Sequence, residues 1–112
     1  MSPGKRNVHR MAAAIDERWR PEVVAEVQGF QLKVVRLEGE FPWHVHEGED
    51  ELFQCIDGSF RIEIEGSEPV AMERGDVFVV PAGVRHRPVA DAPAAALLFE
   101  RAETKQYGDD PG

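Results

Sequence analysis

Short runs of alternating hydrophobic and polar residues follow one another along most of the chain. The clearest run covers residues 60–65 and reads Phe-Arg-Ile-Glu-Ile-Glu. Successive side chains of a β-strand point to opposite faces, so this alternation places the apolar side chains on one face and the charged ones on the other. The pattern predicts a strand with one face in a hydrophobic core and the other face exposed.

Further segments are similarly short and rich in valine, leucine and isoleucine, and glycine-containing turns separate them. Asp57-Gly58 is a strong signal for a two-residue β-hairpin turn. Many short strands with such turns and little helix are typical of a β-sandwich or barrel. The expected strands cover residues 22–28, 30–37, 52–56, 60–65, 69–72, 77–80 and 94–100.

Both ends of the chain depart from this pattern. Residues 11–18 contain three alanines, which favour helix, and predict a short helix that ends before Pro21. At 112 residues the chain has the length of one domain. We therefore expect a tail and a short helix over 1–20, an all-β barrel domain over 21–102 and a polar, frayed C-terminal tail over 103–112.

Composition excludes several classes of partner. The formal net charge of −8 argues against nucleic-acid binding, because phosphate recognition needs a basic face. No apolar run approaches the length that spans a bilayer, and the apolar stretch 11–15 is too short for a secretory signal. The single cysteine, Cys55, fits a reducing compartment. We expect a cytoplasmic protein with neither nucleic acid nor membrane as a partner.

Three histidines and a carboxylate stand out as candidate metal ligands: His44, His46, Glu51 and His86. Residues i and i+2 of a strand share a face, so both imidazoles of His44 and His46 could reach one ion. A turn after His46 would bring Glu51 back on the neighbouring strand. His86 must arrive from another part of the sheet, so the set requires a closed or doubled sheet.

These four residues lie in two motifs. The first consists of Gly39, four residues, His44-x-His46, four residues, Glu51, six residues and Gly58. The second consists of Gly75, five residues, Pro81-x-Gly83, two residues and His86.

Both motifs resemble, in the same order, the two motifs of the cupin superfamily, and the resemblance covers roughly residues 30–100. The six-residue gap to Gly58 selects Glu51 rather than Asp50 as the ligand. Two departures leave the ligands untouched: the usual first motif has five residues before its first histidine, and Ala90 replaces an asparagine that often follows the second motif.

Shorter segments resemble small single-domain cupins of the mannose-6-phosphate isomerase-like type, a label that reflects the fold more than an activity. These segments are Phe41-x-Trp43-His44, Asp50-Glu51-Leu52-Phe53, Val80-Pro81 and His86-Arg87-Pro88. The resemblance implies a double-stranded β-helix, or jelly-roll barrel, and a homodimer. The N-terminal strands are the expected place of the dimer contact, because edge strands need cover.

Three further residues are candidates for the substrate pocket. Phe53 and Cys55 share the inward face of Glu51 by strand alternation, with Cys55 deeper and more suited to packing. Arg36 stands in an apolar strand, where it either pairs with an acid or reaches the pocket to hold an anionic substrate.

The ligand set suits one divalent transition metal ion: zinc, iron, nickel or manganese. The first hypothesis is a metal-dependent, isomerase-like enzyme for a small polar or sugar-like substrate, with Glu51 as the one nameable candidate for a catalytic base. The alternatives are an iron-dependent dioxygenase and a non-catalytic module that binds a sugar or another ligand through the metal.

Overall fold

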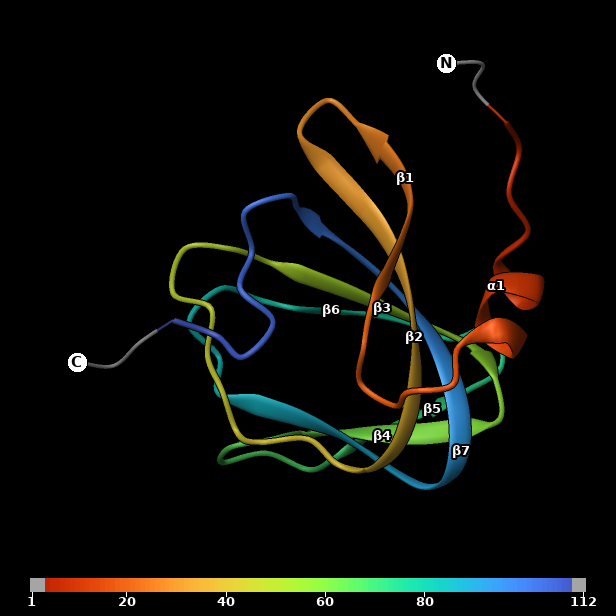
Figure 1. Ribbon diagram of the computed structural model, residues 1–112. Helices are drawn as coiled ribbons and strands as arrows, with labels where there is room; N and C mark the ends of the chain where they lie inside the picture. The colour runs from red at the N-terminus through yellow and green to blue at the C-terminus, as the bar shows by residue number, and fades with distance from the viewer. Residues whose placement is uncertain (1–3, 110–112) are drawn as a thin grey trace.

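The computed structural model describes residues 4–109, which form one short helix and seven strands (Figure 1). The elements in chain order are α1 Val8–Ala14, β1 Glu22–Val27, β2 Phe30–Glu40, β3 Glu51–Asp57, β4 Ser59–Ile64, β5 Val70–Glu73, β6 Val77–Val80 and β7 His86–Arg101. The far ends of the two expected tails, residues 1–3 and 110–112, lie outside the described residues.

The long strand β7 holds the two layers of the fold together. Its first residues pair antiparallel with β4, where Ile64 faces His86, and its last residues pair with β3, where Leu52 faces Phe99. Strand β2 pairs with β7 along nearly its whole length. The sheet runs β1-β2-β7-β3-β6 with β4 and β5 attached, and it does not close into a continuous barrel. The architecture is that of a single all-β domain of jelly-roll type with a short N-terminal helix, as the sequence predicts.

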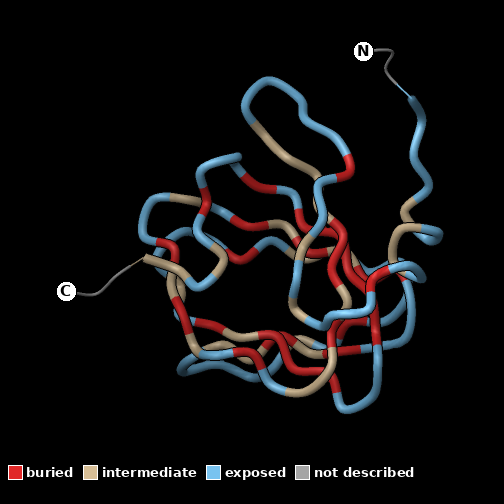
Figure 2. Tube along the Cα trace, viewed as in Figure 1, coloured by how far each residue is buried: buried red, intermediate tan, exposed pale blue. Residues whose placement is uncertain are grey.

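The main core fills the space between the two layers, where Figure 2 shows the buried segments of the strands facing one another. Leu37, Phe53, Ile62 and Met72 are buried there, each from a different strand. A second cluster lies under α1 on the outer face of the sheet, and Ile15 anchors it. Burial of these apolar side chains is the main term that stabilises the domain.

The helix begins earlier than expected and is shorter. It covers Val8–Ala14 because the side chain of Asn7 accepts hydrogen bonds from the backbone N–H groups of His9 and Arg10 and so caps its N-terminus. No helix within residues 4–109 has the length and apolarity that a membrane span requires.

Strand β7 begins at His86, eight residues before the expected start. Pro88, Pro93 and two alanines give residues 86–93 a weak strand signal. Pairing with β2 on one side and β4 on the other overrides this local preference.

The expected hairpin at Asp57-Gly58 is wrong. Strand β3 pairs with β6 and β7, whereas β4 pairs with β5 and β7, so Gly58 joins strands of different layers. Gly58 has a φ of 67°, and a Cβ there would lie 2.9 Å from the carbonyl oxygen of Pro93. Gly58 therefore turns the chain from one layer to the other, at a position where a positive φ and the lack of a side chain are both required.

An apolar band crosses the outer face of the sheet. Val79, Leu52 and Phe99 are cross-strand neighbours on β6, β3 and β7, and Phe30 of β2 stacks on Phe99 with ring centroids 5.5 Å apart. Val27 of β1 faces Phe30 and extends the band. Val27, Val79 and Phe99 are exposed, and β1 and β6 are the edge strands of the main path. Such a surface is suited to covering by a second subunit.

We expect the protein to be a homodimer through this band, with β1 contributing Val27. Phe99→Glu should convert the dimer to a monomer, because it places a charge in an apolar interface, and light scattering after size exclusion measures the mass directly. Ala71→Glu, on the exposed face of β5, is the matched control and should leave the dimer intact. A dimer that survives Phe99→Glu would place the contact elsewhere.

Candidate metal centre

The four sequence-predicted ligands meet at one point between the layers. Glu51 and His86 are the first residues of β3 and β7, and His44 and His46 lie in the connection 41–50. The expected strand through His44 and His46 is reduced to a single bridge, in which His44 N–H donates to His86 O (3.0 Å) and His86 N–H donates to His44 O (2.9 Å). This bridge joins the two sequence motifs.

All four side chains are buried, and one donor atom from each lies within 4.8 Å of the others. Glu51 Oε1 stands 3.5 Å from His46 Nε2 and 3.3 Å from His86 Nε2. The rings of His44 and His86 are closest, with centroids 4.4 Å apart. Three imidazoles and a carboxylate at this spacing could hold a single transition metal ion.

Backbone carbonyls orient two of the imidazoles. His44 Nδ1 lies 2.9 Å from Pro42 O, and His86 Nδ1 lies 2.9 Å from Val84 O, so each ring uses the carbonyl two residues earlier. A carbonyl partner requires Nδ1 to carry the hydrogen, which leaves Nε2 free for an ion.

The third imidazole has no such partner. Both ring nitrogens of His46 are buried without a hydrogen bond among the described residues. A buried polar nitrogen without a partner is costly, and an ion coordinated by His46 would remove that cost for one of the two nitrogens. The residues present therefore fit a metal ion.

Burial and the neighbouring carboxylate shift the ligand pKa values. Burial lowers the pKa of His44 to about 4, which keeps its ring neutral at pH 7. Burial also lowers the pKa of His46, but the carboxylate of Glu51, whose Oε1 lies 3.5 Å from Nε2, outweighs it and raises that pKa. Burial raises the pKa of Glu51, yet its contacts with His46 and His86 prevail and hold that pKa below its ordinary value.

A small cavity lies beside the ligands. His44, Glu51 and Phe53 line it, and Phe41, Leu37 and Leu98 supply further apolar wall. Its polar side includes two charged residues that the sequence reasoning missed, Lys33 and Glu100. Strand alternation could have found them, because Lys33 shares the inward face of Val35 and Leu37, and Glu100 that of Ala96 and Leu98.

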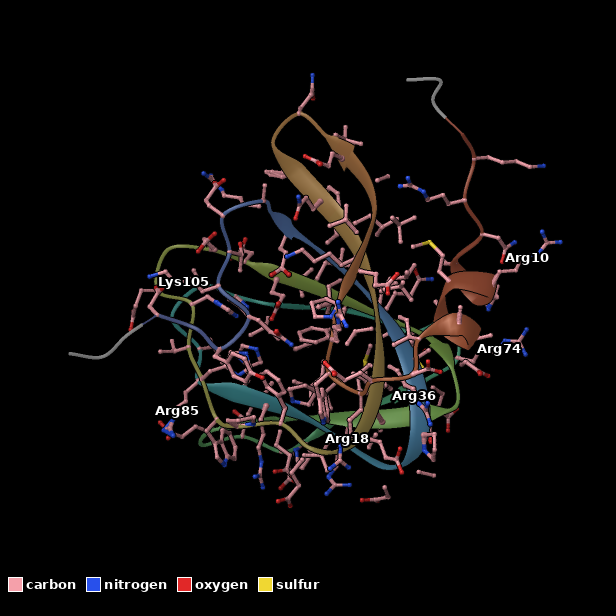
Figure 3. The ribbon with its side chains drawn as sticks, viewed as in Figure 1. Arg10, Arg18, Arg36, Arg74, Arg85 and Lys105 are labelled. Atoms are coloured by element: carbon pink, nitrogen blue, oxygen red, sulfur yellow. The ribbon has the colours of Figure 1, made fainter. Side chains whose placement is uncertain are left out.

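The structure places the three pocket candidates differently. Phe53 lines the cavity. Cys55 does not line it: the thiol is fully buried in the core, where Sγ donates to Gly58 O at 3.3 Å. Arg36 also stays outside, because its side chain lies on the α1 side of the sheet, with Nη2 3.7 Å from Glu38 and Nη1 donating to Ile15 O (Figure 3). Of the two expected alternatives, Arg36 therefore pairs with an acid and does not reach the pocket.

The segment 102–109 packs over the first motif instead of fraying. Glu47 N–H donates to Asp109 Oδ2, and Asp109 N–H donates to Val45 O, both at 2.8 Å. Tyr107 stacks on Phe41 with centroids 4.9 Å apart. Gly108 has a φ of 81°, and a Cβ there would lie 2.5 Å from Val45 O, so this close approach requires glycine. The expected free tail is therefore wrong up to residue 109.

Known proteins share this fold. Residues 33–100 match the family model described as "Cupin domain". The uncharacterized protein YdbB of Bacillus subtilis is 27% identical over 107 residues, which cover 94% of this chain and 95% of YdbB. The crystal structure of a cupin-2 domain containing protein from Shewanella frigidimarina is 31% identical, with a TM-score of 0.82 over 86% of this chain and 93% of that one. A Ralstonia eutropha protein, provisionally assigned as a mannose-6-phosphate isomerase, is 25% identical with a TM-score of 0.69, over 88% of this chain and 98% of that one.

Removal of one ligand should abolish tight metal binding while the fold remains. His86→Ala should weaken binding by more than the roughly 10–100-fold that loss of an outer-shell partner costs. Titration calorimetry with zinc measures the affinity, and circular dichroism checks the fold. His9→Ala, at an exposed position of α1, is the control and should bind like the parent protein. Full metal content in His86→Ala would refute the assignment.

Metal affinity should also depend on pH. Coordination needs a neutral imidazole, so an ion must displace the proton that His46 holds below its raised pKa. Each unit of acidification below that pKa should weaken binding by about tenfold for this proton. His44, with a pKa of about 4, adds no competing proton near neutrality. Calorimetry in buffers of different ionisation enthalpy counts the protons released, and an affinity independent of pH would contradict a histidine site.

Proposed function

The chain belongs to the cupin domain family, and we propose that it is a metal-dependent enzyme that acts on a small polar molecule. The observation that carries this proposal is the convergence of four buried donor atoms within 4.8 Å beside a cavity. The two unpartnered nitrogens of His46 support it further, because buried polar atoms in a purely structural core normally have hydrogen-bond partners.

His44, His46, Glu51 and His86 would hold one divalent ion, and zinc, iron, nickel and manganese all suit this set. When bound, such an ion would supply Lewis-acid chemistry by polarising a hydroxyl or carbonyl oxygen of the substrate. The chain supplies the surroundings. Phe41, against which Tyr107 stacks, forms part of the cavity wall, and the apolar walls lower the local dielectric.

Isomerisation by proton transfer is the favoured reaction. The likeness to the Ralstonia eutropha protein supports an isomerase and a sugar-like substrate. Glu51 is a weak candidate for the base, because its contacts with His46 and His86 hold its pKa below the ordinary value. The other carboxyl group of the cavity belongs to Glu100.

A second candidate is an iron-dependent dioxygenase. The apolar walls of the cavity, with Leu37, Phe53 and Leu98, favour it because they suit a substrate with an apolar body better than they suit a sugar. The third hypothesis, a ligand-binding module, shares the site and differs only in that no reaction takes place after the ligand binds.

The first experiment is metal analysis of untagged protein, followed by assays with the metal found. We expect about one equivalent of metal per chain and turnover of small hydroxy-carbonyl compounds or sugars that persists without oxygen. His86→Ala should lose both metal and turnover, and His9→Ala should keep both. Oxygen consumption that depends on iron would replace the isomerase with the dioxygenase. Ligand binding without turnover in either assay would leave the non-catalytic module.

A further inference from the structure

We propose that Lys33 and Glu100 form a second recognition point in the cavity, which binds a hydroxyl group of the substrate next to the oxygen that meets the metal. This inference rests on the proposed function. It narrows the substrate class to small hydroxy-carbonyl compounds without a phosphate group. Neither residue belongs to the two sequence motifs that carry the ligands.

Glu100 lies next to the metal ligand Glu51. Leu52 pairs with Phe99 across β3 and β7, so the residues one step further along each strand, Glu51 and Glu100, are cross-strand neighbours on the opposite, inward face. Both side chains line the cavity. A molecule bound through an oxygen at the metal centre would therefore have its adjacent atoms within reach of Glu100.

The side chain of Glu100 is almost fully buried and only half satisfied. It is 3% exposed, and its Oε1 accepts a hydrogen bond from Lys33 Nζ at 3.3 Å. Its Oε2 is buried without a partner among the described residues. A ligand that enters the cavity must offer Oε2 a hydrogen-bonding group or leave it unsatisfied at a cost. A hydroxyl suits this oxygen best, because a hydroxyl both donates and accepts.

The charges around the cavity disfavour an anionic substituent. Lys33 is the one cationic side chain among the described residues that line it, and it already pairs with Glu100. A phosphate placed beside Glu100 would find no free cationic side chain among the described lining residues to offset its charge. Positions away from the metal should therefore be taken by uncharged polar groups.

The size of the cavity also restricts the substrate. Its volume of about 40 Å³ is small against the 300–1,000 Å³ typical of pockets for drug-sized ligands. Only a compact molecule of a few non-hydrogen atoms fits without movement of the surrounding segments. A compact hydroxy-carbonyl compound satisfies the metal, Glu100 and the apolar walls together.

The test compares hydroxyacetone, acetone and dihydroxyacetone phosphate as ligands of the cobalt-loaded protein, with the cobalt absorption spectrum as the readout of binding. We expect hydroxyacetone to bind more tightly than acetone by about 10–100-fold, because acetone would leave the buried Oε2 of Glu100 without a partner. It should also bind more tightly than the phosphate. Glu100→Leu should remove the preference for the hydroxyl while the cobalt stoichiometry stays at one per chain.

Two further variants make the result specific. The double variant Lys33→Met/Glu100→Leu leaves no unpaired buried charge, so it guards against a folding failure of Glu100→Leu and should show the same loss of preference. Glu103→Leu, at an exposed position, is the matched control and should behave like the parent protein. Failure of the parent protein to prefer hydroxyacetone, or an undiminished preference in both Glu100 variants, would overturn this inference alone. Failure of the parent protein to bind cobalt would overturn the proposed function and this inference together.

Discussion

The centre depends on the pair of backbone hydrogen bonds that joins His44 to His86. These two histidines lie 42 positions apart in the sequence, and the bridge fixes them opposite each other before any side chain is considered. Each ring then turns to the carbonyl two residues earlier, Pro42 or Val84, so both present the same nitrogen to the centre. Because backbone and carbonyl contacts set the ring positions, the site is preorganised and an ion would bind with little further ordering.

Strand β7 extends this arrangement to the rest of the cavity. It begins at His86 in one layer, bends where it leaves β4, and brings Glu100 beside Glu51 in the other layer. One strand therefore supplies a metal ligand at one end and the carboxyl group of Glu100 at the other. The register between β7 and β3 couples them, since a slip of one residue would turn Glu100 to the outer face and Phe99 inward.

The ligands were predictable from sequence, and the rest of the cavity was harder. His44 and His46 are spaced for one face of an extended chain, and the glycine and proline positions around Glu51 and His86 complete two known motifs. Local patterns failed where contacts with distant segments determine the structure. Residues 86–93 belong to β7 because they pair with β2 and β4. Gly58 turns the chain between layers because β7 lies against it. Lys33 and Glu100 were missed, because their mutual pairing across 67 residues has no local signature in the sequence.

The balance of charge explains why a cation belongs at this point. Two carboxyl groups, those of Glu51 and Glu100, are buried side by side, and Lys33 can offset only one negative charge. In the metal-free protein protons compensate for the rest. Burial and the charge of Glu51 raise the pKa of Glu100 to about 8, and the pKa of His46 rises in spite of burial. A metal ion would take over this compensation, because it would bind one of the unpartnered nitrogens of His46 and neutralise Glu51. A metal ion and protons can thus each compensate the same buried negative charge, and they compete for it. Through this competition the buried charge of the fold affects how strongly the site binds a metal ion.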